Sequence, residues 1–290
     1  MKGAAVLLLI VGSSSPLLAQ QDYEIRLNRS LKPGNQFKVF ARGRILEDFQ
    51  ISLAHEPLQE TKDDFEVEYA ATRKVLEVDK AGRATKVSDI IEQLSVIRAG
   101  NHAELAQRGA SLVAFVQGKK KIFEIDGQRV DDQTEKALKV VIDITTGGPS
   151  DDEVFGTRAR KKLGESWNMN KILAVEDFAK RSNVELRNLA GEVRLESVTH
   201  ESTGDVLKIV CHFKGDARPV SLTTITSSRG PFEATWSTRV PVEPSLARTE
   251  DSIALSLQFQ GKGGAPDHTQ TSVAGTLRKS VICKMTPLND

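Results

Sequence analysis

The chain has 290 residues, 40 of them Lys or Arg and 39 of them Asp or Glu, so its formal net charge at pH 7 is +1. A chain this close to neutral lacks the basic excess that binds a phosphate backbone, which argues against nucleic acid as a partner. Hydrophobic residues make up 39% and charged residues 27% of the sequence, a balance typical of globular proteins. The length suffices for one large β domain or two smaller ones.

The first 19 residues have the layout of a secretory signal peptide. Lys2 is followed by an apolar run over residues 4–11, and Ala19 offers a small residue before a cut at Gln20. This run is much shorter than the ~20 residues that a membrane-spanning helix needs, so a cleaved signal peptide is favoured over an anchor. We therefore expect an exported protein, periplasmic or extracellular, whose mature chain does not span the membrane.

Two stretches of the mature chain share the pattern Lys-x-Gly-x-x-aromatic. They read Leu31-Lys-Pro-Gly-Asn-Gln-Phe37 and Lys161-Lys-Leu-Gly-Glu-Ser-Trp167. Gly in such a stretch favours a turn, and strand-like sequence lies downstream in both cases. The internal repeat predicts two related halves, an N-half over residues 20–148 and a C-half over residues 149–290.

Alternating apolar and polar side chains predict antiparallel strands along most of the N-half. The predicted strands cover residues 23–27, 37–53, 65–78, 111–116 and 121–125. The second could bend at Gly43, and a change of phase after Arg73 predicts a β-bulge in the third. Residues 79–83 and the pair Asp126-Gly127 predict hairpin turns. Residues 85–98 fit a helical stripe as well as a strand, and we expect a strand.

The C-half has the same character. Its predicted strands cover residues 193–195, 207–213, 232–242, 253–259 and 273–285. Many antiparallel strands with one polar face predict a mainly β fold of curved sheets, half-barrel or sandwich-like, with one or two short helices.

The helix signals lie near the middle of the chain. Asp132 and Glu135 form a variant capping box that predicts a helix over residues 132–142, with Leu138, Val141 and Ile142 facing inward. Ser150 is a candidate cap for a short helical turn over residues 151–153. A further short helix is expected around residues 175–180.

No local motif predicts catalysis, a cofactor or a metal site. The five histidines have neither an i, i+2 nor an i, i+4 spacing, and no nucleophile elbow or phosphate-binding loop is present. We therefore expect a protein that is not an enzyme and holds no cofactor or metal. An enzyme whose site is assembled from distant residues ranks last among the hypotheses.

The two cysteines, Cys211 and Cys283, both lie on the apolar side of predicted strands. An even number of cysteines in an exported chain favours a disulfide, whereas two buried thiols are the alternative. Both interpretations stay open, because a disulfide needs Cα atoms within ~7 Å and a simple meander would place these strands apart.

Lys38, Arg42 and Arg44 form a basic stripe on the polar side of their strand. A solvated outer face is the favoured interpretation, because exposed strand faces are ordinarily polar. A rim that binds anions or lipid headgroups is the alternative.

The order of five segments resembles that of a group of uncharacterised exported bacterial β-rich proteins. These segments are residues 31–34, 123–127, 150–156, 162–167 and 240–244. They are turns and strand edges, so the resemblance implies a fold and carries no activity. More loosely, an exported chain of long alternating strands is similar to periplasmic lipoprotein carriers of the LolA and LppX type, which would imply an apolar ligand.

Two functions therefore remain as hypotheses. The first is a carrier whose curved sheet binds an apolar or lipid-like ligand, although an ordinary closed core is the more probable role of each candidate residue. The candidate lining residues are Phe37, Val39, Phe65, Val67, Trp236, Val240, Leu255 and Leu257. The second is a structural or interaction scaffold of the cell envelope, whose partner is another protein.

Overall fold

The computed structural model describes residues 21–53, 56–118, 120–144, 147–182, 184–219, 230–264 and 270–288. The predicted signal peptide, His55 and His268 lie outside these residues.

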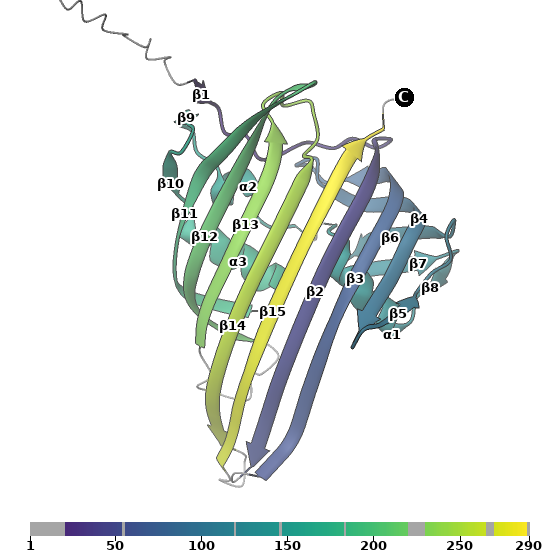
Figure 1. Ribbon diagram of the computed structural model, residues 1–290, viewed down its shortest axis with the longest axis vertical. Coiled ribbons are helices and arrows are strands. Elements are labelled where there is room, and N and C mark those ends of the chain that lie inside the picture. The colour runs from purple at the N-terminus through teal and green to yellow at the C-terminus, as the bar shows by residue number, and fades with distance from the viewer. Residues whose placement is uncertain are drawn as a thin grey trace, which may run out of the picture.

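An antiparallel sheet of 13 strands dominates the described part of the chain (Figure 1). Its order is β10-β11-β12-β13-β14-β15-β2-β3-β4-β6-β7-β8, and β5 pairs with β4. These strands are β2 (Gln36–Leu53), β3 (Glu56–Val78), β4 (Ala84–Arg98), β5 (Asn101–Glu104), β6 (Ser111–Gln117), β7 (Lys120–Ile125), β8 (Gln128–Arg129), β10 (Ser166–Asn168), β11 (Val184–Glu201), β12 (Gly204–Pro219), β13 (Gly230–Pro241), β14 (Glu250–Gly264) and β15 (Gln270–Pro287). A separate ribbon joins β1 (Asp22–Tyr23) to β9 (Lys161–Lys162).

The first and last long strands join the two halves. β15 pairs with β2 along its whole length, from Thr271 opposite Leu53 to Pro287 opposite Phe37. The last strand of the C-half therefore lies beside the first long strand of the N-half, although the two are far apart in the sequence. The two halves share one continuous sheet.

Three helices lie behind the sheet in the view of Figure 1. They are α1 (Asp132–Val141), α2 (Asp151–Phe155) and α3 (Lys171–Ser182). The register aligns Trp236, Ile253, Val281 and Gly43 on four neighbouring strands, so the apolar residues of both halves face the same side. One face of the sheet thus carries the helices, and we call the other the outer face.

Helix α1 lies close against the sheet at Gly43. A Cβ atom placed on this residue would lie 2.5 Å from Cγ1 of Val140, which is too close for any side chain. Gly43 does not divide its strand, because β2 is continuous through it. The glycine instead allows α1 to pack against the sheet.

The structure confirms the predicted fold class, a mainly β chain of curved antiparallel strands with few short helices. Residues 85–98 lie in β4, and register shifts between Val75 and Val78 place a bulge where the phase changes. The hairpin at Asp126 and Gly127 has φ angles of 49° and 77°, as a tight primed turn requires.

The two repeated turns have the same hydrogen bonds. In each, the glycine has a positive φ, and the next residue donates its backbone N–H to the lysine carbonyl while its side chain accepts from the lysine N–H. The equivalent residues are Lys32, Gly34 and Asn35 in the first turn and Lys162, Gly164 and Glu165 in the second. Each turn leads to a buried aromatic residue, Phe37 or Trp167.

The N-terminal segment, residues 21–31, packs differently from the prediction. Of the expected strand over residues 23–27, only Tyr23 pairs with another strand, together with Asp22 before it. Tyr23, Ile25 and Leu27 are buried in the core of the C-half rather than in that of the N-half. The segment therefore crosses from one half to the other before Phe37 begins the N-half core.

The cap of α1 differs from the prediction by one residue. The side chain of Asp131, not Asp132, accepts the backbone N–H of Thr134 at 2.7 Å. The helix itself follows the prediction, with Leu138, Val141 and Ile142 buried. Ser150 caps α2 as expected, and Glu153 completes a capping box with it.

We expect Asp131→Ala to lower the free energy of unfolding by about 1 kcal/mol at pH 7, because it removes the cap. The hydrogen bond from the Thr134 N–H lowers the pKa of Asp131. Its contribution is therefore present above the unfolded-state pKa of ~4 and disappears as pH falls through the folded-state pKa. Urea unfolding at pH 7 and pH 3 would measure both effects.

Two control variants accompany this experiment. Asp131→Asn should keep the cap without its titration, and Asp132→Ala should change the free energy of unfolding by less than about 0.5 kcal/mol. A larger loss from Asp132→Ala than from Asp131→Ala would contradict the assignment.

Candidate functional site

The eight predicted lining residues lie in two separate hydrophobic cores. The N-half core contains Phe37, Val39, Phe65 and Val67. The C-half core contains Trp236, Val240, Leu255 and Leu257. None of the eight is more than 8% exposed, so the structure does not bring them together around one surface.

Helix α1 and charged side chains cover the N-half core. Leu138, Val141 and Ile142 pack into it from the helix and its C-terminal cap. At Phe65, the Arg98 guanidinium lies 4.7 Å and the Lys136 ammonium 5.4 Å from the ring centroid.

Both cations over Phe65 also form ion pairs with Asp63, at 2.5 Å for Arg98. Burial alone would raise the pKa of Asp63, but the hydrogen bonds and charges of Lys136 and Arg98 hold it below its ordinary value. Charged side chains therefore border the core beside Phe65.

Aromatic rings fill the C-half core. Phe155 of α2 stacks on Trp236 with ring centroids 4.3 Å apart. Phe178 of α3 packs edge-on against Phe213 at 4.9 Å. Helix side chains thus occupy the apolar face of the sheet at Trp236, a predicted lining residue, and at Phe213.

The two cysteines are free thiols in separate places. The register from Cys211 to β15 runs through Trp236 and Ile253, so Cys283 lies three strands away. At ~4.8 Å per strand this separation exceeds the ~7 Å that a disulfide allows. Burial raises the pKa of each thiol to about 12, so neither is a reactive thiolate near neutral pH.

A buried ion pair lies inside the N-half core. Arg73 of β3 donates Nε at 2.9 Å and Nη2 at 2.7 Å to the carboxylate of Asp89 on β4. The hydroxyl of Tyr69 donates to the same carboxylate. Burial alone would lower the pKa of Arg73, but the adjacent Asp89 charge raises it. The three side chains satisfy one another's hydrogen bonds. Because Asp89 is 0% exposed, its carboxylate is not accessible from solvent.

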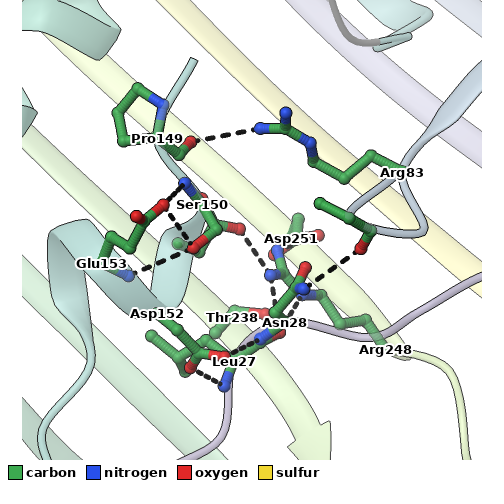
Figure 2. A network of polar contacts seen from close by, with 12 residues as sticks. Leu27, Asn28, Arg83, Pro149, Ser150, Asp152, Glu153, Thr238, Arg248 and Asp251 are labelled. Carbon is green, nitrogen blue, oxygen red and sulfur yellow. Dashed lines mark hydrogen bonds and ion pairs between the residues drawn. The ribbon is translucent and has the colours of Figure 1, made fainter. Parts of the chain in front are cut away.

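Figure 2 shows a second polar network, where the N-terminal segment meets the C-half. Arg248 donates Nη2 to the carbonyl of Leu27 at 2.7 Å and Nη1 to Asp251 at 3.0 Å. It also forms an ion pair with Asp151 of α2. Burial raises the pKa of Asp251, and the nearby Asp151 charge adds to this effect. One arginine therefore connects the segment, a helix and β14.

Other side chains hold the backbone of the same segment. Asp152 accepts the N–H of Leu27 at 2.5 Å and that of Asn28 at 3.0 Å. Asn28 donates its side-chain amide to Ala81, in the β3–β4 hairpin. Over residues 24–31 the segment is thus fixed largely by side chains, where a strand would use a ladder of backbone bonds.

Arg29 is the exception in this network. Its side chain is 9% exposed, and its Nη2 donates to the carbonyl of Pro241. Its Nε and Nη1 are buried without a hydrogen-bond partner. Burial lowers the pKa of Arg29, and the neighbouring Arg248 charge lowers it further. An unsatisfied buried donor costs about 1–3 kcal/mol, and more when it is charged.

The basic stripe is neutralised by carboxylates on neighbouring strands of the outer face. Lys38 pairs with Glu92, Arg42 with Glu66, and Arg44 with Asp64 at 2.8 Å. These pairs match the solvated face that the sequence favours over an anion-binding rim.

The described histidines form no metal site. His200 pairs with Asp205, His102 lies 3.7 Å from Glu104, and His212 contacts the Thr235 hydroxyl at 3.0 Å. Over the described ranges, no group of three or more His, Cys, Asp and Glu side chains could hold a metal ion.

A surface pocket of about 620 Å³ lies beside β4. Its lining mixes polar and apolar groups, and Glu92 within it is the extra residue of a β-bulge opposite Ala70 and Ala71. Its lining residues are Glu92, Gln93, Glu104, Leu105, Ala106, Gln107 and Arg108. Glu92 is already bound to Lys38 and Thr72, so its carboxylate is not a free group in this pocket.

The buried charges were not predicted from the sequence. Arg73 and Asp89 occupy the apolar phase of their strands, and Asp89 lies between the buried residues Val87 and Ile91. A charged residue in the apolar phase of a strand was the sequence signal that could have revealed this buried pair. Arg29 occupies the buried phase after Tyr23, Ile25 and Leu27, but a short segment gives no strand pattern strong enough to interpret.

No protein-family model matches the chain, and comparison with curated proteins gives no match. Among solved structures, the outer membrane protein OprG from Pseudomonas aeruginosa is 7% identical, covers 89% of this chain and 98% of its own, and has a TM-score of 0.16. Pseudomonas aeruginosa OccK2, solved with glucuronate, is also 7% identical, covers 92% and 100%, and has a TM-score of 0.18. Within the described residues no helix is both long enough and apolar enough to cross a membrane. Such low structural scores assign neither a family nor an activity.

We expect Arg73→Met and Asp89→Asn each to lower the free energy of unfolding by about 3–5 kcal/mol, because each leaves or unbalances a buried charge. The double variant should lose less than the sum, since it removes the charged pair together. Urea unfolding of the four proteins gives the coupling energy. Strictly additive losses would show that the two side chains act independently.

Proposed function

We propose that this protein is an exported, non-catalytic interaction protein that serves as a scaffold in the cell envelope. The observation that carries the proposal is the division of the sheet into two unlike faces. All eight predicted ligand positions on the apolar face are buried, each at most 8% exposed, and helix side chains pack into both cores, as Phe155 does on Trp236. The outer face bears no helix among the described residues, so it is free for a partner protein.

The character of the outer face supports a protein partner. Near β2 it carries paired charges of both signs, including Arg42 with Glu66 and Arg44 with Asp64. Toward β13 and β14 it carries small side chains, with Ser237 and Ser252 in hydrogen bond at 2.7 Å and Ala254 exposed. Small side chains beside fixed charges suit a protein surface, because charges set register while small residues allow close approach.

Export supports the envelope as the location. The expected signal peptide over residues 1–19 supports this part of the proposal, which covers a periplasmic or an extracellular location.

A carrier of an apolar ligand is the second candidate. One observation favours it: Val281, Cys283 and Met285 on β15 are only partly buried, on the helix-bearing face beside the N-half core. An apolar ligand would have to bind there rather than at the eight predicted positions.

Native mass spectrometry of the mature protein, purified from its host without detergent, separates the two. We expect a mass without a lipid-sized adduct, because the cores are already filled. An adduct that organic extraction removes would overturn the scaffold proposal in favour of the carrier.

Site-specific photo-crosslinking in the host tests the outer face directly. We expect a photoreactive residue at Ala254, on the outer face, to give a discrete crosslinked protein. The matched control is Lys139, which is exposed on α1 and should give none. Equal crosslinking from both positions, or none from Ala254, would contradict docking on the outer face.

A further inference from the structure

Arg29 is a buried cation that the rest of the described chain does not neutralise. The other buried arginines are paired: Arg73 with Asp89, and Arg248 with Asp151 and Asp251. Arg29 has a single partner, the neutral carbonyl of Pro241. Because a buried charge is stable only when it is paired and hydrogen-bonded, the isolation of Arg29 needs an explanation.

Its surroundings do not supply the missing charge. Asp152 and Glu243 are near enough to act on Arg29 electrostatically, but neither lies at ion-pair distance in the described structure. Asp152 is already bound to the backbone of the N-terminal segment. Arg248 and Arg26 are also close and oppose the Arg29 charge. Arg248 is itself paired with Asp151 and Asp251, and Arg26 with Glu24. The feature that calls for a further group is therefore the pair of unpartnered donors on Arg29 and not a net positive field.

The free donors define the chemistry of that group. Nε carries one N–H bond and Nη1 carries two, and a guanidinium only donates. Such donors prefer oxyanions, to which arginine forms short charge-assisted hydrogen bonds. We propose that Arg29 is the binding residue of a small-anion site between the N-terminal segment and the loop over residues 242–249, and that its ligand is a freely diffusing oxyanion such as phosphate or a small carboxylate.

The position of the site determines how a ligand reaches it. The loop over residues 242–249 begins directly after Pro241, the acceptor of Arg29, and Val242 and Glu243 in it are exposed. Since Nε and Nη1 are closed to solvent, an anion enters by displacement of this loop. A headgroup still attached to a bilayer cannot reach a side chain that is 9% exposed, so the ligand is a free ion.

Binding would tie the N-terminal segment to the C-half. Residues 24–31 have few backbone bonds of their own, and Arg29 is their last buried side chain before Leu31 reaches the N-half core. An anion held by Arg29 would therefore lower the frequency with which this segment opens locally. This inference is independent of the proposed scaffold function.

The test measures the melting temperature of the full mature chain in chloride and in phosphate, at equal pH and ionic strength, with acetate as a separate arm. Wild type should gain roughly 3 °C at ten times the dissociation constant in at least one of the two oxyanions. Hydrogen exchange at the Leu27 and Asn28 amides should slow in the same buffer. Both readouts use the intact protein.

Arg29→Met keeps the apolar stem of the side chain and removes the charge. It should melt in chloride at or above the wild-type temperature, because it removes an unpaired buried cation, and should lose the oxyanion response. Arg26→Gln is the matched control: it removes a charge from the same segment, but that side chain is 56% exposed, so the oxyanion response should persist. Arg29→Lys replaces Arg29→Met if the latter does not fold, and should respond less than wild type.

Phosphate stabilises many proteins without binding them, so the difference between variants decides the outcome. Equal gains in wild type and Arg29→Met would overturn the proposal, as would no gain in either oxyanion. A loss of melting temperature by Arg29→Met in chloride, with no oxyanion response in wild type, would assign Arg29 a structural role through Pro241 and overturn it too.

Discussion

The pairing of β15 with β2 is the constraint on which the rest of the structure depends. It aligns the inward-facing residues of both halves on one face, so that α1, α2 and α3 can all pack on the same side. Without it the chain would form two smaller sheets, each with an exposed hydrogen-bonding edge. The packing of all three helices on one face and the separation of the two cysteines both follow from this order of strands.

Polar groups specify how the two cores are arranged. Arg73 and Asp89 satisfy each other inside the N-half core, while Arg248 and Asp152 fix an N-terminal segment that has little strand pairing. Such groups contribute less to stability than apolar packing of the same volume, but they restrict which segments can lie together. In this protein they select where residues 21–31 pack, a choice that the apolar side chains Tyr23, Ile25 and Leu27 alone would leave open.

The regular part of the fold was predictable because strand periodicity and turn chemistry are local properties. Alternation identified β2, β3, β13 and β14, and glycine positions identified the repeated turns. The grouping of the candidate lining residues was not predictable, since it depends on which strands become neighbours and on where the helices pack. Period two shows that Phe37 and Trp236 face inward, but it does not tell whether a helix or a ligand covers them. The cap at Asp131 was missed by one residue because two consecutive aspartates satisfy the same pattern.

The seam between the first and last long strands also has a kinetic consequence. β2 is synthesised long before its partner β15, because most of the described chain lies between them. Pairing between such distant segments is slow, because loop-closure entropy must be overcome before the contacts form. Until β15 has been synthesised, one edge of β2 is unpaired and able to join other chains. A chain of this topology therefore depends on protection of that edge of β2 until β15 is available to pair with it.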